Sequence, residues 1–468
     1  MKKIACIVLV LAMVLGLCAC EIGGSTPSLK VGYSKQCISP TKGVSLSGYA
    51  NDADRISTEV LYDVYVTCIA FQEGEDTVLM FSQDSQGMGT EVAKAVRSQI
   101  TMATGVPQKR IMFGDTHSHS SPTISNNADY VDFFNTVYLP AVLAAAKEAI
   151  ADLSPATLHG TKVQTEAMNY VRHYIVANGT IAGSNFGDYI LEHKEHLRDG
   201  DREMVLIKAE RKAKDKQDIL LMNWACHPTL TGGGSSSTIV TADYVGTCRD
   251  AIEAETDMLF MFYQGGGGDE VATSQVPSLK RDPAWTIETY GQALAKYAID
   301  ALPTMEKIEG EGIKTEQYVG EFATNKYRQD LLKEAQLVIE RYNEVGSVEA
   351  KAYGRTLGIY NGHTEARGII NCSKTGLYTD MELDALYIGG MAFVTAPWEM
   401  FSDTAIYIKE NSPFKYTVVI SLGNGKSSYL PTKEAFEYGC YESFNSTYGA
   451  GVAEEAAEKL VSMLKGFQ

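Results

Sequence analysis

The sequence predicts a layered α/β fold. Apolar runs of strand length recur along the chain, amphipathic helical patterns separate them, and most runs end at a polar or glycine-rich segment. Alternating strands and helices are typical of α/β domains, in which functional sites lie where strands end and loops begin. We therefore expect a mixed sheet in layers, flanked by helices.

The predicted elements follow one another in a regular order. Gly105 ends the first helix as a C-terminal cap, and Pro140 kinks or breaks the second. Gly310-Glu311-Gly312 is the best candidate for a subdomain boundary, although no true linker is evident. The predicted strands are 60–71, 77–81, 110–113, 218–226, 258–264, 314–322 and 415–422, with a glycine-centred hairpin over 385–396. The predicted helices are 91–103, 130–151, 241–255, 284–307, 328–345, 400–409 and 454–464.

The segment from Gly114 to Pro122 carries two histidines directly after an apolar strand. Residues i and i+2 of an extended strand point to the same face, so His117 and His119 are expected to project together. Neutral imidazole is the commonest protein ligand of zinc, which makes the pair a candidate half-site. The alternative is a pair of polar loop histidines bonded to neighbouring hydroxyl groups.

Other apolar strands also end in candidate ligands. Pro228 stops one strand and leaves His227 at its end, and another strand runs into the glycines 265–268 and Asp269. Those glycines allow positive φ angles and close approach of the backbone to a ligand, or simply a flexible turn. Three of the eight histidines thus lie at strand ends. Nitrogen and oxygen ligands from separate segments, without thiolates, are typical of a catalytic zinc site with an open position for water.

Several other classes of protein are disfavoured. The formal net charge of −17 and the lack of a basic run argue against nucleic-acid binding. No Gly-Lys-Ser/Thr follows the glycines, so there is no Walker loop, and neither Gly-x-Ser-x-Gly nor His-Glu-x-x-His occurs. The cysteines after residue 20 form no Cys-x-x-Cys pair and therefore no thiolate zinc cluster.

The N-terminus resembles a bacterial lipoprotein signal. A short basic start precedes an apolar run that is too short to span a bilayer comfortably. The run leads into Leu17-Cys18-Ala19-Cys20, which predicts a signal peptide over 1–19, a lipid on Cys20 and a flexible tether over 20–28. The mature protein is then expected at the cell surface, anchored by lipid to a bacterial membrane. The alternatives are an ordinary secretory signal cleaved nearby, or Cys18 as the lipidated residue.

Taken together, the segments resemble the catalytic domain of the neutral/alkaline (non-lysosomal) ceramidases over nearly all of the mature chain. The segment 115–122 is similar to that family's Thr-His-Thr-His-Ser-Gly-Pro, and Pro397-Trp398-Glu399 is similar to its Pro-Gly/Ala-Glu. The remaining matches are Val31-Gly32-Tyr33, Ser47-Gly48-Tyr49-Ala50, Ala225-Cys226-His227-Pro228-Thr229, Ala242-Asp243-Tyr244-Val245-Gly246 and Ser428-Tyr429-Leu430-Pro431-Thr432-Lys433-Glu434.

The resemblance implies a set of metal ligands. The family's second, non-ligand histidine falls on His119, a candidate to hydrogen-bond the substrate or intermediate. Taken one at a time, each residue is better explained without a metal: Glu399 as a carboxylate in the first turn of a helix, Tyr429 as a core tyrosine and His227 as a buried, hydrogen-bonded histidine. The zinc ligands implied by the family are His117, His227, Glu399 and Tyr429.

The resemblance also implies two further catalytic residues and shows two departures. Arg172 is the candidate for the arginine of the family's Asn-Arg-Ser motif. Asp269 matches the aspartate of the family's Gly-Asp turn and is the second candidate catalytic residue. The family's turn continues to a serine implicated in catalysis, whereas Val271 stands in that place here, with Thr273 and Ser274 nearby. The chain ends soon after the last motif, so we expect it to lack the C-terminal immunoglobulin-like domain of full-length ceramidases.

These observations predict a hydrolase of ceramidase type over residues 29–468, with Zn²⁺ as its cofactor. It is expected to cleave the amide of an N-acyl lipid, ceramide-like, or of a related small amide, by metal-activated water. One alternative is a zinc hydrolase of an unrelated ester, phosphoester or cell-wall amide. Another is a non-catalytic surface-binding lipoprotein of the same fold. The oligomeric state stays open.

The lipoprotein interpretation makes a direct prediction about the mature N-terminus. Mass spectrometry of the protein purified from its native membrane should find Cys20 as the first residue, carrying lipid. A Cys20→Ala variant should lose the lipid mass, while Cys18→Ala should keep it. An unmodified terminus well downstream of Cys20 would contradict the interpretation.

Overall fold

The computed structural model describes residues 28–49, 54–183, 192–279 and 285–468. The predicted signal peptide at 1–19, Cys20 and the tether up to residue 27 lie outside these ranges. Within them, no helix combines the length and the apolar character needed to cross a bilayer.

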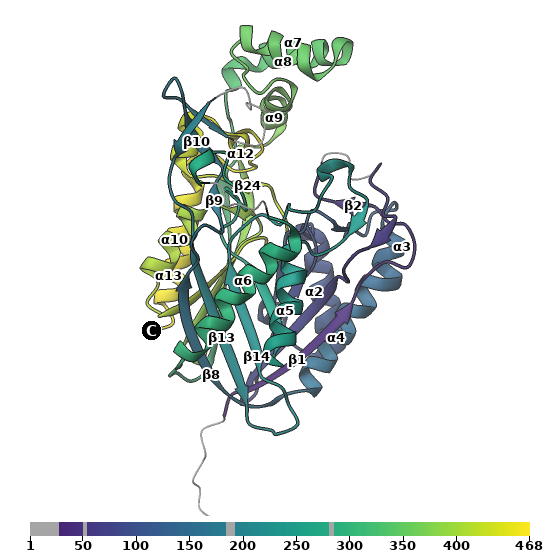
Figure 1. The fold of residues 1–468 in the computed structure, drawn as a ribbon, viewed down its shortest axis with the longest axis vertical. Helices are drawn as coiled ribbons and strands as arrows, with labels where there is room; N and C mark the ends of the chain where they lie inside the picture. The colour runs from purple at the N-terminus through teal and green to yellow at the C-terminus, as the bar shows by residue number, and fades with distance from the viewer. Residues whose placement is uncertain (1–27, 50–53, 184–191, 280–284) are drawn as a thin grey trace, which may run out of the picture.

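A large mixed sheet forms the centre of the molecule (Figure 1). Its described strands pair in the order β16-β14-β13-β8-β1-β4-β5-β6, with β18 beside β8. The pairs β5–β6 and β14–β16 are parallel and the others are antiparallel, which confirms the predicted mixed sheet. The strands are β1 (Lys30–Cys37), β4 (Tyr65–Glu73), β5 (Asp76–Gln83), β6 (Ile111–Asp115), β8 (Ser154–Gln164), β13 (Glu203–Arg211), β14 (Ile219–Trp224), β16 (Leu259–Gln264) and β18 (Glu306–Lys307).

The sheet has two arms, one made of β16, β14, β13 and β8 and the other of β1, β4, β5 and β6. The strands of the two arms pair with each other through a short contact between β1 and β8. Two residue pairs make that contact, Lys30 with Pro155 and Val31 with Ser154. The edge strands at the other ends of the two arms, β6 and β16, lie close together, because a Cβ atom on Gly114 of β6 would come within 2.6 Å of the Tyr263 ring on β16. Beside them, Ser82 Oγ near the end of β5 donates to the carbonyl oxygen of Phe262 on β16 at 2.5 Å. The strand ends that precede the histidine-bearing loops are therefore neighbours in space.

A second sheet packs against the first. Its inward side chains, Leu386, Phe393 and Val418 among them, share one core with Val31 and Met80 of the first sheet. The segment 310–312 lies where the chain passes from β18 in the first sheet to β19 in the second. The strands of the second sheet, in order, are β19 (Ile313–Ala323), β20 (Tyr378–Ile388), β21 (Met391–Thr395) and β23 (Tyr416–Ile420).

Helices cover the outer faces of both sheets, as predicted (Figure 1). Helices α2 and α4 pack on the arm that contains β4 and β5, α5 and α6 on the arm that contains β13 and β14, and α10 and α13 on the second sheet. Helices α7, α8 and α9 form a separate group with a small core of its own, at the top of Figure 1. Their bounds are α2 (Thr90–Thr104), α4 (Leu139–Ala151), α5 (Tyr244–Thr256), α6 (Ile287–Ala301), α7 (Leu332–Val345), α8 (Ser347–Thr356), α9 (His363–Lys374), α10 (Ser402–Asn411) and α13 (Val452–Lys465).

The helix expected over 130–151 is confirmed. It runs through α3 (Val131–Phe133), a π-helical turn over Phe134–Tyr138 and α4, with Pro140 just after the π-helical turn. Two other helix predictions were wrong in detail. The helix expected over 284–307 ends at Ala301, and residues 306–307 form β18. The helix expected from residue 400 begins at Ser402, because β22 (Glu399–Met400) pairs in parallel with β24 (Tyr429–Leu430).

Candidate metal centre

Loops that follow β6, β14 and β21 bring three histidines and a glutamate to one buried point. His117 Nε2 lies 3.3 Å from the Nε2 atoms of both His119 and His227. Glu399 Oε2 lies 3.3 Å from His117 Nε2 and 3.2 Å from His227 Nε2. The structure thus brings together the two predicted histidine ligands, the predicted glutamate ligand and the predicted catalytic histidine.

The two neighbouring histidines converge for a different reason from the one predicted. Strand β6 ends at Asp115, and the His117 amide N–H donates to the carbonyl oxygen of Ser85 at 2.8 Å. His117 has a φ of +68°, in the left-handed region that non-glycine residues rarely occupy. The interpretation of His117 and His119 as residues of one extended strand was therefore wrong. A strained turn aims both imidazoles at the same point, as is common at functional sites.

The protonation of the two predicted ligand histidines follows from their other ring nitrogens. His117 Nδ1 lies 2.7 Å from the carbonyl oxygen of Gln86, and His227 Nδ1 lies 2.6 Å from that of Gly267. Because a carbonyl oxygen only accepts hydrogen bonds, each Nδ1 carries the proton and each Nε2 presents a lone pair. Two lone pairs at 3.3 Å repel each other unless a proton or a metal ion lies between them. This arrangement is typical of histidine metal ligands.

The spacing of the donor atoms fits zinc. Tetrahedral ligands about 2.0–2.1 Å from a zinc ion lie about 3.3 Å from one another, close to the distances observed here. Glu399 Oε2 is buried and receives no hydrogen bond from the described residues. Burial, helped by Arg172, lowers the pKa of His227 to about 4, so this ring is neutral at pH 7.

Tyr429 lies against the same centre. It is the direct partner of Glu399 in the β22–β24 pair, and its ring stacks at 6.4 Å from the ring of His227. Burial and Glu399 raise the pKa of Tyr429, while Arg172, whose guanidinium lies 5.5 Å from the ring, opposes that rise. The structure places Tyr429 beside Glu399 and His227. Its role as a zinc ligand stays a prediction.

Arg172 and Asp269 lie in supporting positions. Arg172 donates to Glu442 Oε1 at 2.8 Å and to the carbonyl oxygen of Gly268 at 2.9 Å. Asp269 accepts from the backbone N–H of Ser402 at 2.8 Å and from its hydroxyl at 2.9 Å. These contacts fix the 265–269 turn and the start of α10, three residues after Glu399. The predicted catalytic role of both residues stays a prediction.

The glycine turn at 265–268 packs closely against the backbone of residues 399 and 400. None of its four glycines has a positive φ, so that expectation was wrong. Gly268 N–H donates to the carbonyl oxygen of Met400 at 2.8 Å, and a Cβ atom on Gly268 would meet the carbonyl oxygen of Glu399 at 2.7 Å. The turn needs glycine because it packs directly on the strand that carries Glu399.

The departures from the ceramidase pattern lie beside the centre. Val271 pairs with Tyr170, and its backbone bridges to His227. Ser274 is buried and its hydroxyl lies 2.9 Å from His196 Nε2, whereas Thr273 is exposed. Neither hydroxyl belongs to the cluster of ring nitrogens described above.

A second group of potential ligands behaves differently. His173, Cys440 and Glu442 lie close enough to share a metal ion. Here, however, both ring nitrogens of His173 have protein partners, Glu442 at 3.1 Å and the hydroxyl of Tyr438 at 2.9 Å. Cys440 Sγ lies 3.2 Å from the hydroxyl of Ser443. This group is a hydrogen-bonded support for Arg172, and the first group is the better candidate metal centre.

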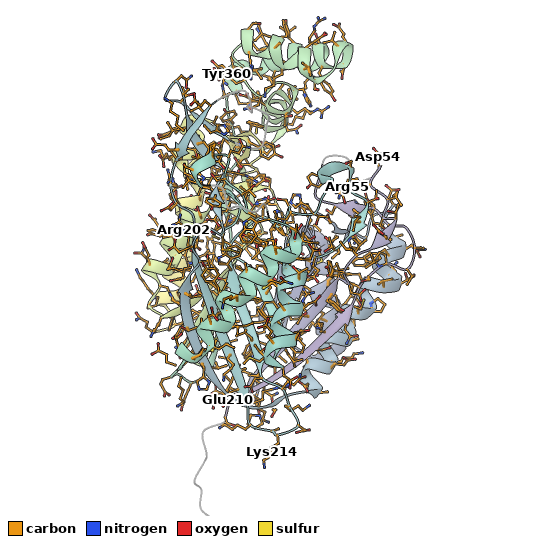
Figure 2. All side chains as sticks on the ribbon, in the orientation of Figure 1. Asp54, Arg55, Arg202, Glu210, Lys214 and Tyr360 are labelled. Carbon is orange, nitrogen blue, oxygen red and sulfur yellow. The ribbon has the colours of Figure 1, made fainter. Side chains whose placement is uncertain are left out.

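Several residues that shape the centre were not predicted. The carbonyl groups of Gln86 and Gly267 orient two imidazoles, and backbone carbonyls leave no signature in a sequence. Gly48 has a φ of +126° and lies so close to His119 that a Cβ atom would come within 2.7 Å of it. Arg55, labelled in Figure 2, donates to the carbonyl oxygen of His119 at 3.0 Å. Of these, only the glycine in the Ser-Gly-Tyr-Ala motif was visible beforehand.

Comparison with known proteins supports the fold. No family model matches the sequence, and no curated protein matches it. Among solved structures, the chain is similar to the neutral ceramidase from Pseudomonas aeruginosa, with a TM-score of 0.69 and 15% sequence identity. This chain has the ceramidase fold. The match covers 95% of this chain and 75% of that one, and a ceramidase complexed with C2 gives the same values.

The packing of the glycine turn predicts an effect on metal binding. Gly268→Ala should push the Glu399 strand away and weaken zinc binding by about 10- to 100-fold, as loss of ligand-supporting contacts typically does. Gly232→Ala is the matched control, because a Cβ atom there meets nothing within 4 Å. Competition with a zinc chelator measures both affinities. Equal affinities in the two variants would contradict the proposed support of Glu399.

Proposed function

We propose that this protein is a zinc-dependent amide hydrolase of ceramidase type, which cleaves an N-acyl lipid or a related small amide. The observation that carries the proposal is the convergence of His117, His227 and Glu399 at zinc-like spacing, on a ceramidase fold. The similar solved structures are those of a neutral ceramidase and of a ceramidase complexed with C2, which supports an N-acyl substrate.

The donor set assigns the metal-holding residues. His117 and His227 would hold the ion through Nε2 and Glu399 through a carboxylate oxygen, with Tyr429 as the fourth residue. Zinc, when bound, supplies an activated water at neutral pH and Lewis acidity toward the amide carbonyl. The hydrogen bonds from the Nδ1 atoms keep both imidazoles in the tautomer that this role requires.

His119 differs from the other two histidines in a way that suits proton transfer. Its Nδ1 is buried without a hydrogen-bond partner among the described residues, so no carbonyl group fixes its tautomer. The edge of Tyr49 packs on its ring at 5.1 Å and holds it in place. We assign to His119 Nε2 the stabilisation of the oxyanion or the delivery of a proton to the leaving amine.

The attack is assigned to water and not to a side-chain hydroxyl. Val271 offers no hydroxyl at the place of the family's serine, and the Ser274 hydroxyl is buried against His196. An acyl-enzyme intermediate is therefore not expected. The anchorage at Cys20 is part of the same proposal, and it would hold the enzyme at the cell surface. An unrelated ester, phosphoester or cell-wall amide as substrate, or a binding role without catalysis, are the competing proposals.

The proposed role of His119 separates activity from metal content. His119→Ala should lower kcat on a short-chain ceramide or another N-acyl amide by about 10²- to 10⁴-fold. Zinc content should stay at the wild-type level, because the other ligands remain. His363→Ala, in helix α9 of the separate helical group, serves as the control. Turnover is measured by mass spectrometry of the released fatty acid, and zinc by elemental analysis of the same sample.

Two outcomes would contradict this assignment. Loss of zinc together with activity in His119→Ala would make His119 a metal ligand. Wild-type turnover in His119→Ala would remove it from the mechanism.

A further inference from the structure

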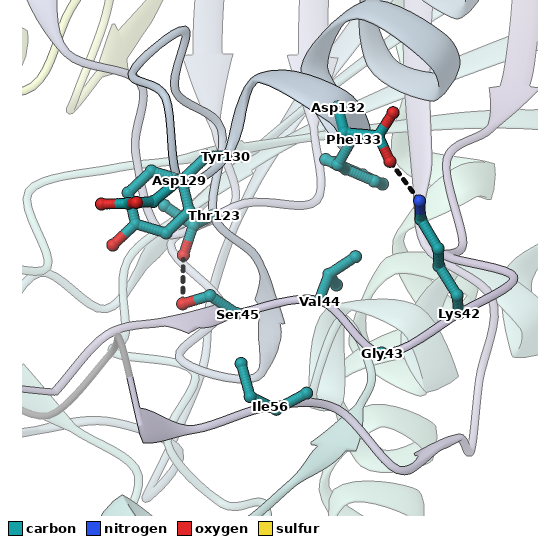
Figure 3. A pocket seen from close by; sticks show the side chains of 10 residues that line it. All are labelled: Lys42, Gly43, Val44, Ser45, Ile56, Thr123, Asp129, Tyr130, Asp132 and Phe133. Atoms are coloured by element: carbon teal, nitrogen blue, oxygen red, sulfur yellow. Dashed lines mark hydrogen bonds and ion pairs between the residues drawn. The ribbon is translucent and has the colours of Figure 1, made fainter.

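Lys426 is a cation beside the candidate metal centre with no carboxylate partner in the parts of the chain that the structure describes. It lies in the loop between β23 and β24, three residues before Tyr429. Its ammonium group donates to the side-chain oxygen of Gln86, which is uncharged. Some lysines elsewhere form ion pairs, such as Lys409 with Asp201 at 2.7 Å and Lys42, in the pocket of Figure 3, with Asp132. Lys426 forms no such ion pair, although the buried carboxyl group of Asp115 interacts with it electrostatically.

The position of Lys426 is built by its surroundings. The lysine stem lies over Gly87, where a Cβ atom would come within 2.5 Å of Lys426 Cδ and 3.0 Å of its Cγ. Gly87 has a φ of +149°, so a side chain there is disfavoured both by the backbone conformation and by the close contact with Lys426. The oxygen of Gln86 that receives the ammonium also accepts from the hydroxyl of Ser47 at 3.2 Å. A flexible surface lysine needs none of these features.

The ammonium group is linked to His119 through a short chain of contacts. Ser47, which shares the Gln86 oxygen, directly precedes Gly48, and Gly48 packs against His119. The carbonyl group of Gln86 orients His117. Lys426 is thus held by the same residues that position the two histidines.

A fixed ammonium next to a site for a divalent cation is electrostatically unfavourable unless an anion joins it. Asp115 acts on Lys426 electrostatically but forms no ion pair with it, because its carboxyl group accepts hydrogen bonds from Gln83 and Ser85. The ammonium group can therefore still pair with an anionic ligand. An amino-acid carboxylate on the amine half of the amide would be such a ligand, because His119, to which these contacts link Lys426, is assigned to the leaving amine.

We propose that Lys426 binds a carboxylate on the amine half of the substrate, so that N-acyl amino acids are preferred over neutral N-acyl lipids. This inference rests on the proposed amide hydrolysis. Lys426 is then a specificity-determining residue, because it contacts the group that distinguishes these two classes of substrate. A hydrogen bond between charged groups typically contributes about 10- to 100-fold in affinity.

A matched pair of substrates tests the inference on the zinc-loaded protein. N-octanoylglycine and N-octanoylglycinamide differ only in replacing the carboxylate by a neutral amide, and a short-chain ceramide is the third substrate. The wild-type protein should prefer the glycine compound over the glycinamide by about 10- to 100-fold in kcat/KM, mainly through KM. Lys426→Met should abolish that preference, while Lys426→Arg should retain most of it. Lys42→Met, which removes a paired lysine, should keep the wild-type ratio.

Each other outcome overturns the inference in a recognisable way. If the wild-type protein cleaves the glycinamide or the ceramide but shows no preference for the carboxylate, the inference fails and the proposed function stands. If Lys426→Met loses equal activity on both glycine compounds, Lys426 acts through His119 and not on the substrate. If no amide is cleaved, the proposed function fails and the inference with it. The wild-type ratio decides the matter even if Lys426→Met does not fold.

Discussion

The structure depends on one electrostatic constraint: several electron-pair donors are buried within about 3.3 Å of one another. Without a cation, the Nε2 lone pairs of His117 and His227 would face each other beside the Glu399 carboxylate, in a place without solvent. The surrounding loops nevertheless hold them there, through the carbonyl groups of Gln86 and Gly267 and through the packing of Gly268 on the Glu399 strand. Such a cost is expected of a metal site, and it supports the proposed metal ion at this centre.

The fold places these donors by bringing distant strand ends together. The edge strands β6 and β16 of the first sheet are neighbours, and the β22–β24 pair brings Glu399 and Tyr429 to the same end. Ligands from separate segments can then be positioned independently. Val271, which stands at the place of the family's serine, lies at the same end, where its backbone bridges to His227. Lys426 lies in the loop before Tyr429 and supplies the charge on which the proposed carboxylate preference rests.

Much of the layered fold could be predicted from the sequence, because continuous apolar runs indicate buried strands such as β14 and β16. Strand β8 was missed, since it alternates apolar with polar residues and carries a histidine, a lysine and a glutamine. Strand β13 was missed as well, because only four apolar residues, Met204 to Ile207, stand between charged ends. Their burial comes from their central places in the sheet, where β8 pairs with β1 and β13, and β13 pairs with β8 and β14. The site residues were found because a few short motifs resemble one family, whereas the left-handed turn at His117 and the supporting Glu442–His173 pair have no local signature.

The most direct test of the account is a crystal structure of the protein with diffraction data collected on both sides of the zinc absorption edge. The account predicts one strong anomalous peak, about 2.0–2.2 Å from His117 Nε2, His227 Nε2 and a Glu399 oxygen. A map without a peak at that point, or with zinc only between His173, Cys440 and Glu442, would contradict it.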